Sequence, residues 1–411
     1  MKQIRERTAG LDVHRDLVVA CTRVPGESGV VVAKRRFATT PGGVAVLADW
    51  LTAAGVTTVV MEATGVYWKA VFYPLEGRFE ELWLVNAAHV KNVPGRKTDM
   101  IDAEWLADVA AHGMVRPSFV PPPPIRELRE LTRYRTTQID ARADEIRRLE
   151  KVLQDAGVKL TSVASRVWTM SGRAMVEALI AGERDPGALA ELAKGKLRAR
   201  RAELAEVMPA SWSAHHAAVA RQILSHIDFL DASITTLTEE IAARIDAGAF
   251  DETLELAVTA PGVARRATEI LIAETGADLT VFATAAQFCS WIGVAPGTKE
   301  SAGKRKPAKS MPGNRHLRRI LIEAARAAAR TDTFLGARYR RIARRAGPNK
   351  AAVAVARSLA TALYYMLTTH QPYHDLGPDF YDRPAHKEHI LRDHVRHIEA
   401  MGYSVVLSAT T

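Results

Sequence analysis

The order of strand and helix patterns in the first 112 residues is the feature that most restricts the fold of this chain. Three apolar runs separated by polar turns occupy residues 8–37 and predict three consecutive strands. The patterns that follow are a helix between Pro41 and Gly55, a buried strand TTVVME, a helix around Val66 to Leu75, a strand ELWLVN and a helix from roughly Thr98 to His112. This order, β-β-β-α-β-α-β-α, predicts a mixed sheet with helices on its faces.

A run of prolines marks the end of this α/β region. Residues 117–124 read PSFVPPPP, which predicts a stiff extended linker because four prolines cannot continue a helix. Helical spacing of apolar residues then covers Ile125 to about Gly157 and roughly 163–182, 187–207 and 212–247. We expect an N-terminal domain (1–116), the linker (117–124), a helical or coiled-coil region (125–250), a mostly helical C-terminal domain (251–371) and a tail (372–411).

The helical patterns leave two interpretations open. The long patterns between residues 125 and 250 favour an antiparallel helical pair used for dimerisation, but an ordinary helical bundle has the same spacing. Further on, the turn Pro261-Gly262-Val263 between two helical patterns resembles a helix-hairpin-helix. The amide groups of such a turn can contact a phosphate backbone.

Composition excludes several classes of protein. The formal charge of +10 indicates an anionic partner such as nucleic acid. Cys21 and Cys289 are the only cysteines, too few for a disulfide framework or a cysteine zinc site, so we expect a cytoplasmic protein. No run of eighteen apolar residues predicts a membrane span, and the N-terminus lacks the apolar core of a secretory signal.

Four carboxylates stand where a catalytic site would need them. Asp12 interrupts the first strand, although aspartate is disfavoured in strands and costly to bury; Glu62 closes the strand TTVVME. Asp99 and Asp102 are three residues apart and so share one helix face. Taken singly, Glu62 could be a turn residue and Asp99 a first-turn charge favoured by the helix dipole. Together they predict a site for Mg²⁺ or Mn²⁺, in which two ions can stabilise both oxygens of a phosphodiester exchange.

The segments GLDVHRD, VVMEATGVYW and NAAHVKNVPGRKTDMIDAEWLA resemble the RuvC-like, ribonuclease-H-fold domain of the DEDD transposases of bacterial insertion sequences. The family motif falls on Asp12, Glu62, Asp99 and Asp102. The resemblance implies an α/β RNase H-like (RuvC-like) catalytic domain, followed by an all-α helical section and a mostly helical C-terminal transposase domain. Lys97 precedes the third carboxylate closely; it is either a nucleic-acid contact or a surface lysine.

Positive charge is concentrated between residues 299 and 350. Only Glu300, Glu323 and Asp332 oppose it, and its density among glycine and proline loops favours phosphate contacts over a merely solvated basic face. The basic residues are Lys299, Lys304, Arg305, Lys306, Lys309, Arg315, Arg318, Arg319, Arg326, Arg330, Arg338, Arg340, Arg341, Arg344, Arg345 and Lys350. We single out those from Lys299 to Arg319 as nucleic-acid-binding candidates.

Ser301 lies inside this basic region. By chemistry alone it is one loop serine among several, but the resemblance implies a serine nucleophile in this slot. That slot follows the Gly-x-x-Pro turn 293–296 and precedes the Gly-Asn-Arg-x-Leu-Arg segment 313–318. The family more often has glycine directly after the serine, whereas Ala302 follows it here, which leaves Ser310 as a weaker rival. Metal held by the carboxylates would supply activation and charge neutralisation.

The resemblance therefore implies an enzyme that cuts and rejoins DNA through a transient phosphoserine link. It also implies guidance by a structured bridge RNA and a homo-dimer or tetramer acting on nucleoid DNA, in which a different protomer could deliver the serine. One rival is a RuvC-like nuclease that uses water and forms no covalent intermediate. A second rival is a nucleic-acid scaffold with a decayed site, which the four carboxylates argue against. The tail histidines suggest either metal binding or an ordinary surface tail: His370, His374, His386 and His389.

Overall fold

The chain forms two compact units, Met1–Val120 and Pro121–Thr411, with the boundary inside the proline run. The computed structural model describes residues 3–63, 65–86, 90, 102–164, 166–208, 211–248, 250–297, 299–301, 304–306, 312–382 and 384–407.

The first unit is built on a five-stranded mixed sheet with strand order β3-β2-β1-β4-β5. β1 is antiparallel to β2 and parallel to β4, and β5 is parallel to β4. The elements are β1 (Thr8–Val13), β2 (Leu17–Gly26), β3 (Gly29–Ala38), α1 (Pro41–Ala53), β4 (Thr58–Glu62), α2 (Trp68–Leu75), β5 (Glu81–Val85) and α4 (Asp102–Ala111). The mixed sheet predicted from the sequence is confirmed; the predicted helix at Thr98 begins at Asp102 within the described residues.

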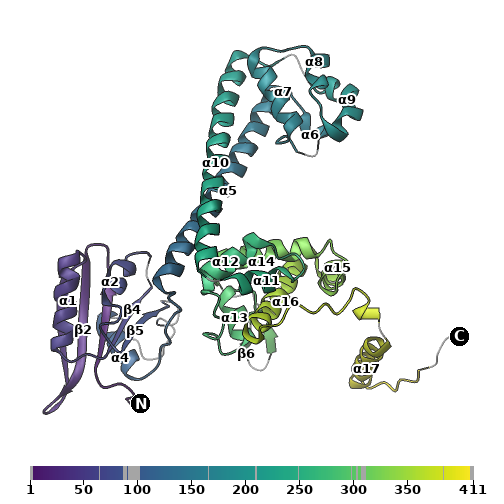
Figure 1. Ribbon diagram of the computed structural model, residues 1–411. Helices are drawn as coiled ribbons and strands as arrows, with labels where there is room; N and C mark the ends of the chain where they lie inside the picture. The colour runs from purple at the N-terminus through teal and green to yellow at the C-terminus, as the bar shows by residue number, and fades with distance from the viewer. Residues whose placement is uncertain are drawn as a thin grey trace. The chain divides into compact units, whose positions relative to one another are not determined.

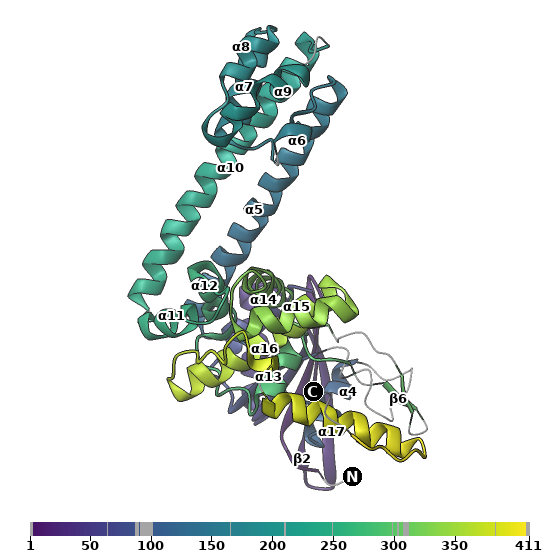
Figure 2. The same cartoon turned by 90° about the vertical axis from the view of Figure 1, so that its right-hand side faces the viewer.

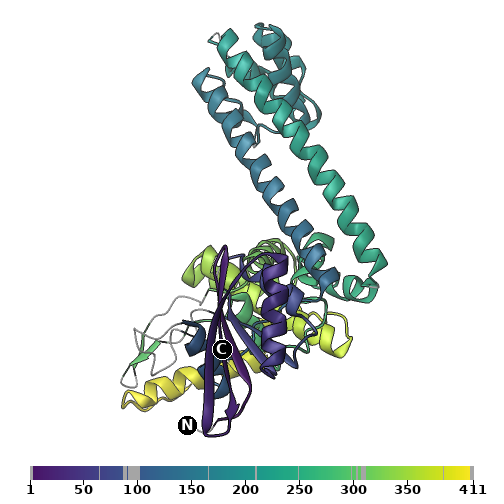
Figure 3. The ribbon, with the colours of Figure 1, turned by 90° about the vertical axis from the view of Figure 1, so that its left-hand side faces the viewer.

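Helices cover both faces of this sheet. Leu11 and Met61 lie in one core with side chains of α1 and α2, whereas Val60 lies in a second core with Leu106 and Val109 of α4. Alternate residues of β1 and β4 therefore face α1 and α2 on one side and α4 on the other. Figure 3 shows the long β2–β3 hairpin of this unit with α1 beside it.

The second unit begins with two long helices that lie side by side, α5 (Pro123–Asp155) and α10 (Ala214–Ala247) (Figures 1 and 2). The antiparallel pair expected from the sequence is thus formed within one chain, and dimerisation stays a prediction. α5 begins inside the predicted extended linker. Proline is tolerated in the first helical turn because its missing N–H would have had no helical partner there.

At the far end of this helical pair lies a small group of short elements, which we call the tip. Its elements are α6 (Leu160–Val163), α7 (Met170–Ala181), α8 (Pro186–Glu191), η1 (Gly195–Arg200) and α9 (Arg201–Glu206). The two longer helices predicted for residues 163–182 and 187–207 are broken. Thr169 caps α7, Gly182 ends it with φ of 110°, and the backbone at Gly195 takes φ of 59°. Leu149 and Leu153 of α5 share a core with Met175 of the tip, which joins the tip to the helical pair.

The other end of the helical pair packs on a helical domain that we call the base. Its elements are α11 (Asp251–Val258), α12 (Arg265–Thr275), α13 (Ala285–Ile292), β6 (Lys299–Ser301), β7 (Lys304–Lys306), α14 (Arg315–Ala328), α15 (Phe334–Ala346) and α16 (Pro348–Thr369). Leu128 of α5 and Ile241 of α10 share a core with Ile272 of α12. The tail contains η2 (Phe380–Asp382) and α17 (Pro384–Ala400).

Within the described part of the chain, α16 is the one helix long and apolar enough to cross a membrane by length and composition. Half of its apolar window is buried, and Val355, Leu359 and Leu363 lie in the core of the base with Phe288 and Leu317. Its hydrophobicity is therefore explained by its place at the centre of this helical domain.

Candidate active site

Two of the predicted carboxylates stand at the ends of neighbouring parallel strands. The last paired residues of β1 and β4 are Leu11 and Met61, so Asp12 and Glu62 occupy the next position on each strand. Leu11 and Met61 are fully buried toward α1 and α2. Because side chains alternate along a strand, Asp12 and Glu62 belong to the opposite face, which α4 covers.

α4 brings a third carboxylate toward this position. The Thr8 hydroxyl donates a 3.0 Å hydrogen bond to the carbonyl of Ala107, and Gly10 lies against Ala103 one helical turn earlier. The end of β1 that carries Asp12 therefore lies toward the beginning of α4, where Asp102 is the first residue. The sheet and the helix thus direct three carboxylates to one edge of the first unit.

Gly10 permits this approach because it has no side chain. A Cβ added to Gly10 would lie 2.6 Å from the amide nitrogen of Ala107 and still closer to the carbonyl oxygen of Ala103. Both neighbours are backbone atoms of α4, so the helix would have to move away from β1. A glycine in a strand is a sequence signal for such close approach, although Gly10 was not among the residues expected to shape the site.

Replacement of Gly10 by alanine is expected to destabilise the first unit by about 3 kcal/mol, the upper end of the range found for overpacked cores. The same change should weaken metal binding, because α4 carries Asp102. Urea unfolding and metal titration of the full-length protein measure the two effects. Gly42→Ala is the matched control, since a Cβ there meets nothing within 4 Å. Equal stability of both variants would contradict the close packing of α4 on β1.

The chemistry of this edge fits a hard divalent cation, since each of the three side chains offers carboxylate oxygens. Asp12 is partly exposed, and its Oδ2 lies 3.0 Å from Nε2 of His14, a neighbour that the sequence analysis did not single out. No group of three or more carboxylate, histidine or cysteine side chains close enough to hold a metal occurs among the described residues. Asp99, the fourth predicted carboxylate, lies outside them, as does Lys97.

In the second unit, Ser301 is the last residue of β6, which pairs with β7 in a two-stranded hairpin. The antiparallel register pairs Ser301 with Lys304, Glu300 with Arg305 and Lys299 with Lys306. The hairpin thus places Ser301 in register with three lysines and an arginine of the basic region, whereas Lys309 and the rival Ser310 lie outside the described residues.

The two sequence motifs that flank Ser301 meet at the neck of its loop. The amide of Asn314 donates a 2.9 Å hydrogen bond to the carbonyl of Trp291, and a Cβ on Gly313 would lie 2.5 Å from that same oxygen. Gly293 ends α13 with φ of 85°, a left-handed conformation that favours glycine. The segment that contains β6 and β7 therefore leaves the helices of the base after α13 and rejoins them before α14 at nearly the same point.

Asn314 also begins α14 and joins it to a buried carboxylate. Its Oδ1 accepts hydrogen bonds from the backbone amides of His316 and Leu317, and its Nδ2 donates to Oε2 of Glu274 at 2.6 Å. The Glu274 side chain is fully buried and accepts two hydrogen bonds from Arg133 of α5, at 2.8 and 2.9 Å. The end of the serine loop is thus tied through α12 to the helical pair.

Charge explains why Glu274 stays ionised in this position. Burial raises the pKa of its carboxyl group, but the hydrogen bond from Arg133 and the charges of Arg129 and Arg133 outweigh burial and hold the pKa below its usual range. The sequence offers a signal for this network, a glutamate within the apolar run ILIAETG. Glu274 was not among the residues expected to be functional.

The three basic candidates on α14 differ in their surroundings. Arg319 donates two 2.6 Å hydrogen bonds to Asp140 of α5 and one of 3.0 Å to Glu323. Its positive charge is therefore already paired with carboxylates of the protein. The hydrogen bond from Arg319 holds the pKa of Asp140 below its usual range. Arg315 is exposed and donates to His316, and Arg318 is half-buried.

Comparison with known families covers both units. Residues 9–157 match a DEDD family described as a transposase, and residues 254–340 match the transposase IS116/IS110/IS902 family. The first range contains Asp12, Glu62 and Asp102, and the second contains Ser301. No curated protein sequence matches the chain significantly.

Proposed function

Because this chain belongs to the IS110-type family of DEDD transposases, enzymes that cut and rejoin DNA, we propose that it moves an insertion sequence with a carboxylate site and a serine nucleophile. The carboxylate site consists of Asp12, Glu62, Asp99 and Asp102, and the nucleophile is Ser301. The observation that supports the serine assignment is the hairpin register, which pairs Ser301 with Lys304 and Lys299 with Lys306.

The carboxylates are proposed to hold Mg²⁺ or Mn²⁺. DEDD nuclease domains generally use divalent metals, and the positions of Asp12, Glu62 and Asp102 toward one edge of the first unit support this choice. A bound ion would supply charge neutralisation at the phosphate. The residues themselves supply the oxygen ligands, and Gly10 sets the distance between the strand that carries Asp12 and the helix that carries Asp102.

The serine step exchanges one phosphate ester for another. The Ser301 Oγ forms a bond to phosphorus and gives up its proton, one P–O bond to deoxyribose breaks, and the departing sugar oxygen takes a proton. Attack by a deoxyribose hydroxyl on the phosphoserine reverses these changes and rejoins DNA, so no external energy source is needed. Lys299, Lys304 and Lys306 would stabilise the charge that develops on the phosphate.

Three finer features complete the proposal. A structured bridge RNA from the element would select target and donor, which the charge of +10 permits. The turn between α11 and α12, with Gly262 at φ of 82°, would contact the phosphate backbone as in a helix-hairpin-helix. Two or four copies would assemble on cytoplasmic, nucleoid DNA, where Ser301 and the carboxylates could come from different protomers.

The test is the search for protein-linked DNA. The full-length protein is incubated with the DNA of its element, the flanking RNA and Mg²⁺, and the products are separated on a denaturing gel. We expect a covalent adduct that disappears in Ser301→Ala and persists in Ser310→Ala. Omission of the RNA should abolish the adduct if RNA guides the protein.

The matched controls separate this mechanism from its rival. Cleavage without any adduct, undiminished by Ser301→Ala, would mean that water is the nucleophile and would leave a RuvC-like nuclease. Loss of the adduct in Ser310→Ala, with Ser301→Ala still active, would transfer the role of nucleophile to Ser310.

A further inference from the structure

The tip carries a cluster of exposed basic side chains. Residues 194–201 read KGKLRARR and contain η1 and the first residue of α9. Arg200 of this segment donates a hydrogen bond to the carbonyl of Val163, which holds η1 against the turn that contains Arg166. Lys194, Lys196 and Arg198 are thereby grouped with Arg166. We call these four residues the tip patch.

The tip patch is not neutralised within its own unit. Among the described residues, all four members are exposed, and none forms an ion pair. Their basic neighbours differ, since Arg200 pairs with Glu203 and Arg201 with Glu191. Ion pairing thus uses part of the basic segment and leaves the remainder available to an external anion.

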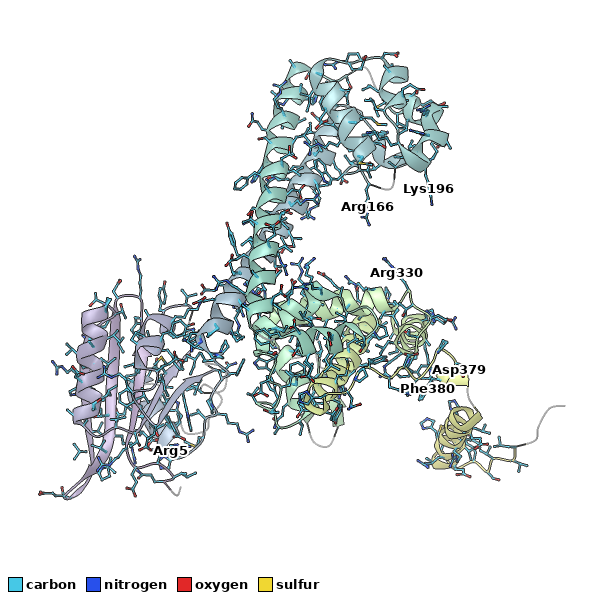
Figure 4. The ribbon with its side chains drawn as sticks, viewed as in Figure 1. Arg5, Arg166, Lys196, Arg330, Asp379 and Phe380 are labelled. Atoms are coloured by element: carbon cyan, nitrogen blue, oxygen red, sulfur yellow. The ribbon has the colours of Figure 1, made fainter. Side chains whose placement is uncertain are left out.

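The tip patch is directed toward the base. The tip and the base project from the same side of the α5–α10 pair (Figure 1). Figure 4 shows Arg166 and Lys196 pointing from the tip toward the base and Arg330 pointing from the base toward the tip. Arg330 is also exposed and unpaired among the described residues. Basic side chains of the tip and of the base are thus directed toward each other along the α5–α10 pair. Each of these two helices is about 50 Å long at 1.5 Å per residue.

The exposed side chains of the tip indicate whether single-stranded or double-stranded nucleic acid fits this surface. Proteins that bind single strands stack bases on exposed aromatic side chains. The described tip residues include one large exposed hydrophobic side chain, Met170, and no exposed aromatic one. Trp168 is half-buried and lies near the guanidinium groups of Arg142 and Arg173. The tip patch is thus suited to phosphates alone, as in sequence-independent contacts with a duplex.

We propose that the tip patch is an accessory binding site for the phosphate backbone of double-stranded DNA, which is held between the tip and the base. Residues 158–253 lie between the two ranges that match the transposase families, so those matches assign no role to the tip. The site would hold DNA next to the sequence being exchanged and add affinity without adding sequence preference. The proposal rests on the DNA activity of the family and not on the assignment of Ser301.

The experiment measures binding of the full-length protein to a duplex of scrambled sequence over a range of salt concentrations. A chelator is present, so neither cleavage nor the serine affects the result. Arg166→Ala combined with Lys196→Ala should lower the affinity and reduce the slope of log K against log salt. Each lost phosphate contact removes about 0.9 from the slope, or roughly 1.8 for the pair.

The matched control is Lys151→Ala combined with Arg221→Ala, which removes the same charge from exposed, unpaired positions of α5 and α10. We expect its salt slope to equal that of the unchanged protein. An unchanged slope in the tip variant, or an equal loss in both variants, would overturn the proposal. A tip variant that loses affinity only for structured RNA would also overturn the proposal, because the tip patch would then bind RNA instead of double-stranded DNA.

Discussion

Asp12→Asn is expected to reduce DNA strand cleavage at least about a thousand-fold, which corresponds to ~4 kcal/mol of activation free energy. The substitution keeps the size of the side chain and removes the negative charge that a divalent cation needs. It should leave the thermal unfolding temperature nearly unchanged, since Asp12 is partly exposed at the end of β1. The rate of cleavage of element DNA at saturating Mg²⁺ is the measurement.

His14→Asn provides the control for this result. It removes the 3.0 Å contact to Asp12 but leaves the carboxylate in place. We expect it to retain most of the activity. If a higher Mg²⁺ concentration alone restored the cleavage rate of Asp12→Asn, the substitution would have weakened Mg²⁺ binding. Full activity of that variant at the ordinary Mg²⁺ concentration would refute the metal-holding role of Asp12.

Glu274→Leu is expected to produce the largest loss of stability in the second unit, roughly 3–5 kcal/mol. It leaves donors of Arg133 and Asn314, and the charge of the mostly buried Arg129, without the carboxylate that they contact, and removal of one partner of a buried ion pair has a cost of this size. Glu274→Gln should lose less, because one amide oxygen still accepts a hydrogen bond. Urea unfolding of the full-length protein, with a probe in the second unit, measures both variants.

The control is Glu323→Gln, which removes a glutamate that also pairs with an arginine but is 40% exposed. Exposed pairs contribute at most about 1 kcal/mol, so this variant should unfold near the unchanged protein. Similar losses for Glu274→Gln and Glu323→Gln would contradict a special role for the buried network.

The contribution of Glu274 should depend on pH in a defined direction. Its pKa in the folded protein is lowered, so the unfolded state binds the proton more readily. The stabilisation is complete above the pKa of an unfolded glutamate, about 4.3, and is lost as pH falls through the lower folded value. The difference in stability between Glu274 and Glu274→Gln should therefore shrink in acid.

The sequence by itself determined the local order of this protein. Alternating and helical apolar spacing predicted the mixed sheet, the long helices, the position of Asp12 within the first strand and that of Glu62 at the end of its strand, because these periodicities follow directly from backbone geometry. It also placed Ser301 between two recognisable motifs. The roles of these residues remain predictions, as do the domain boundaries.

Only the tertiary structure decided which distant residues meet. The sequence contains Gly10 and Ala103 but not their contact, since strand register and helix packing bring them together. The same holds for Glu274, whose partners Arg133 and Asn314 lie 141 and 40 residues away. Arg319 illustrates the consequence. The sequence makes it a candidate for binding nucleic acid, yet in the fold it pairs with Asp140 of α5, because charge compensation depends on which surfaces are brought together.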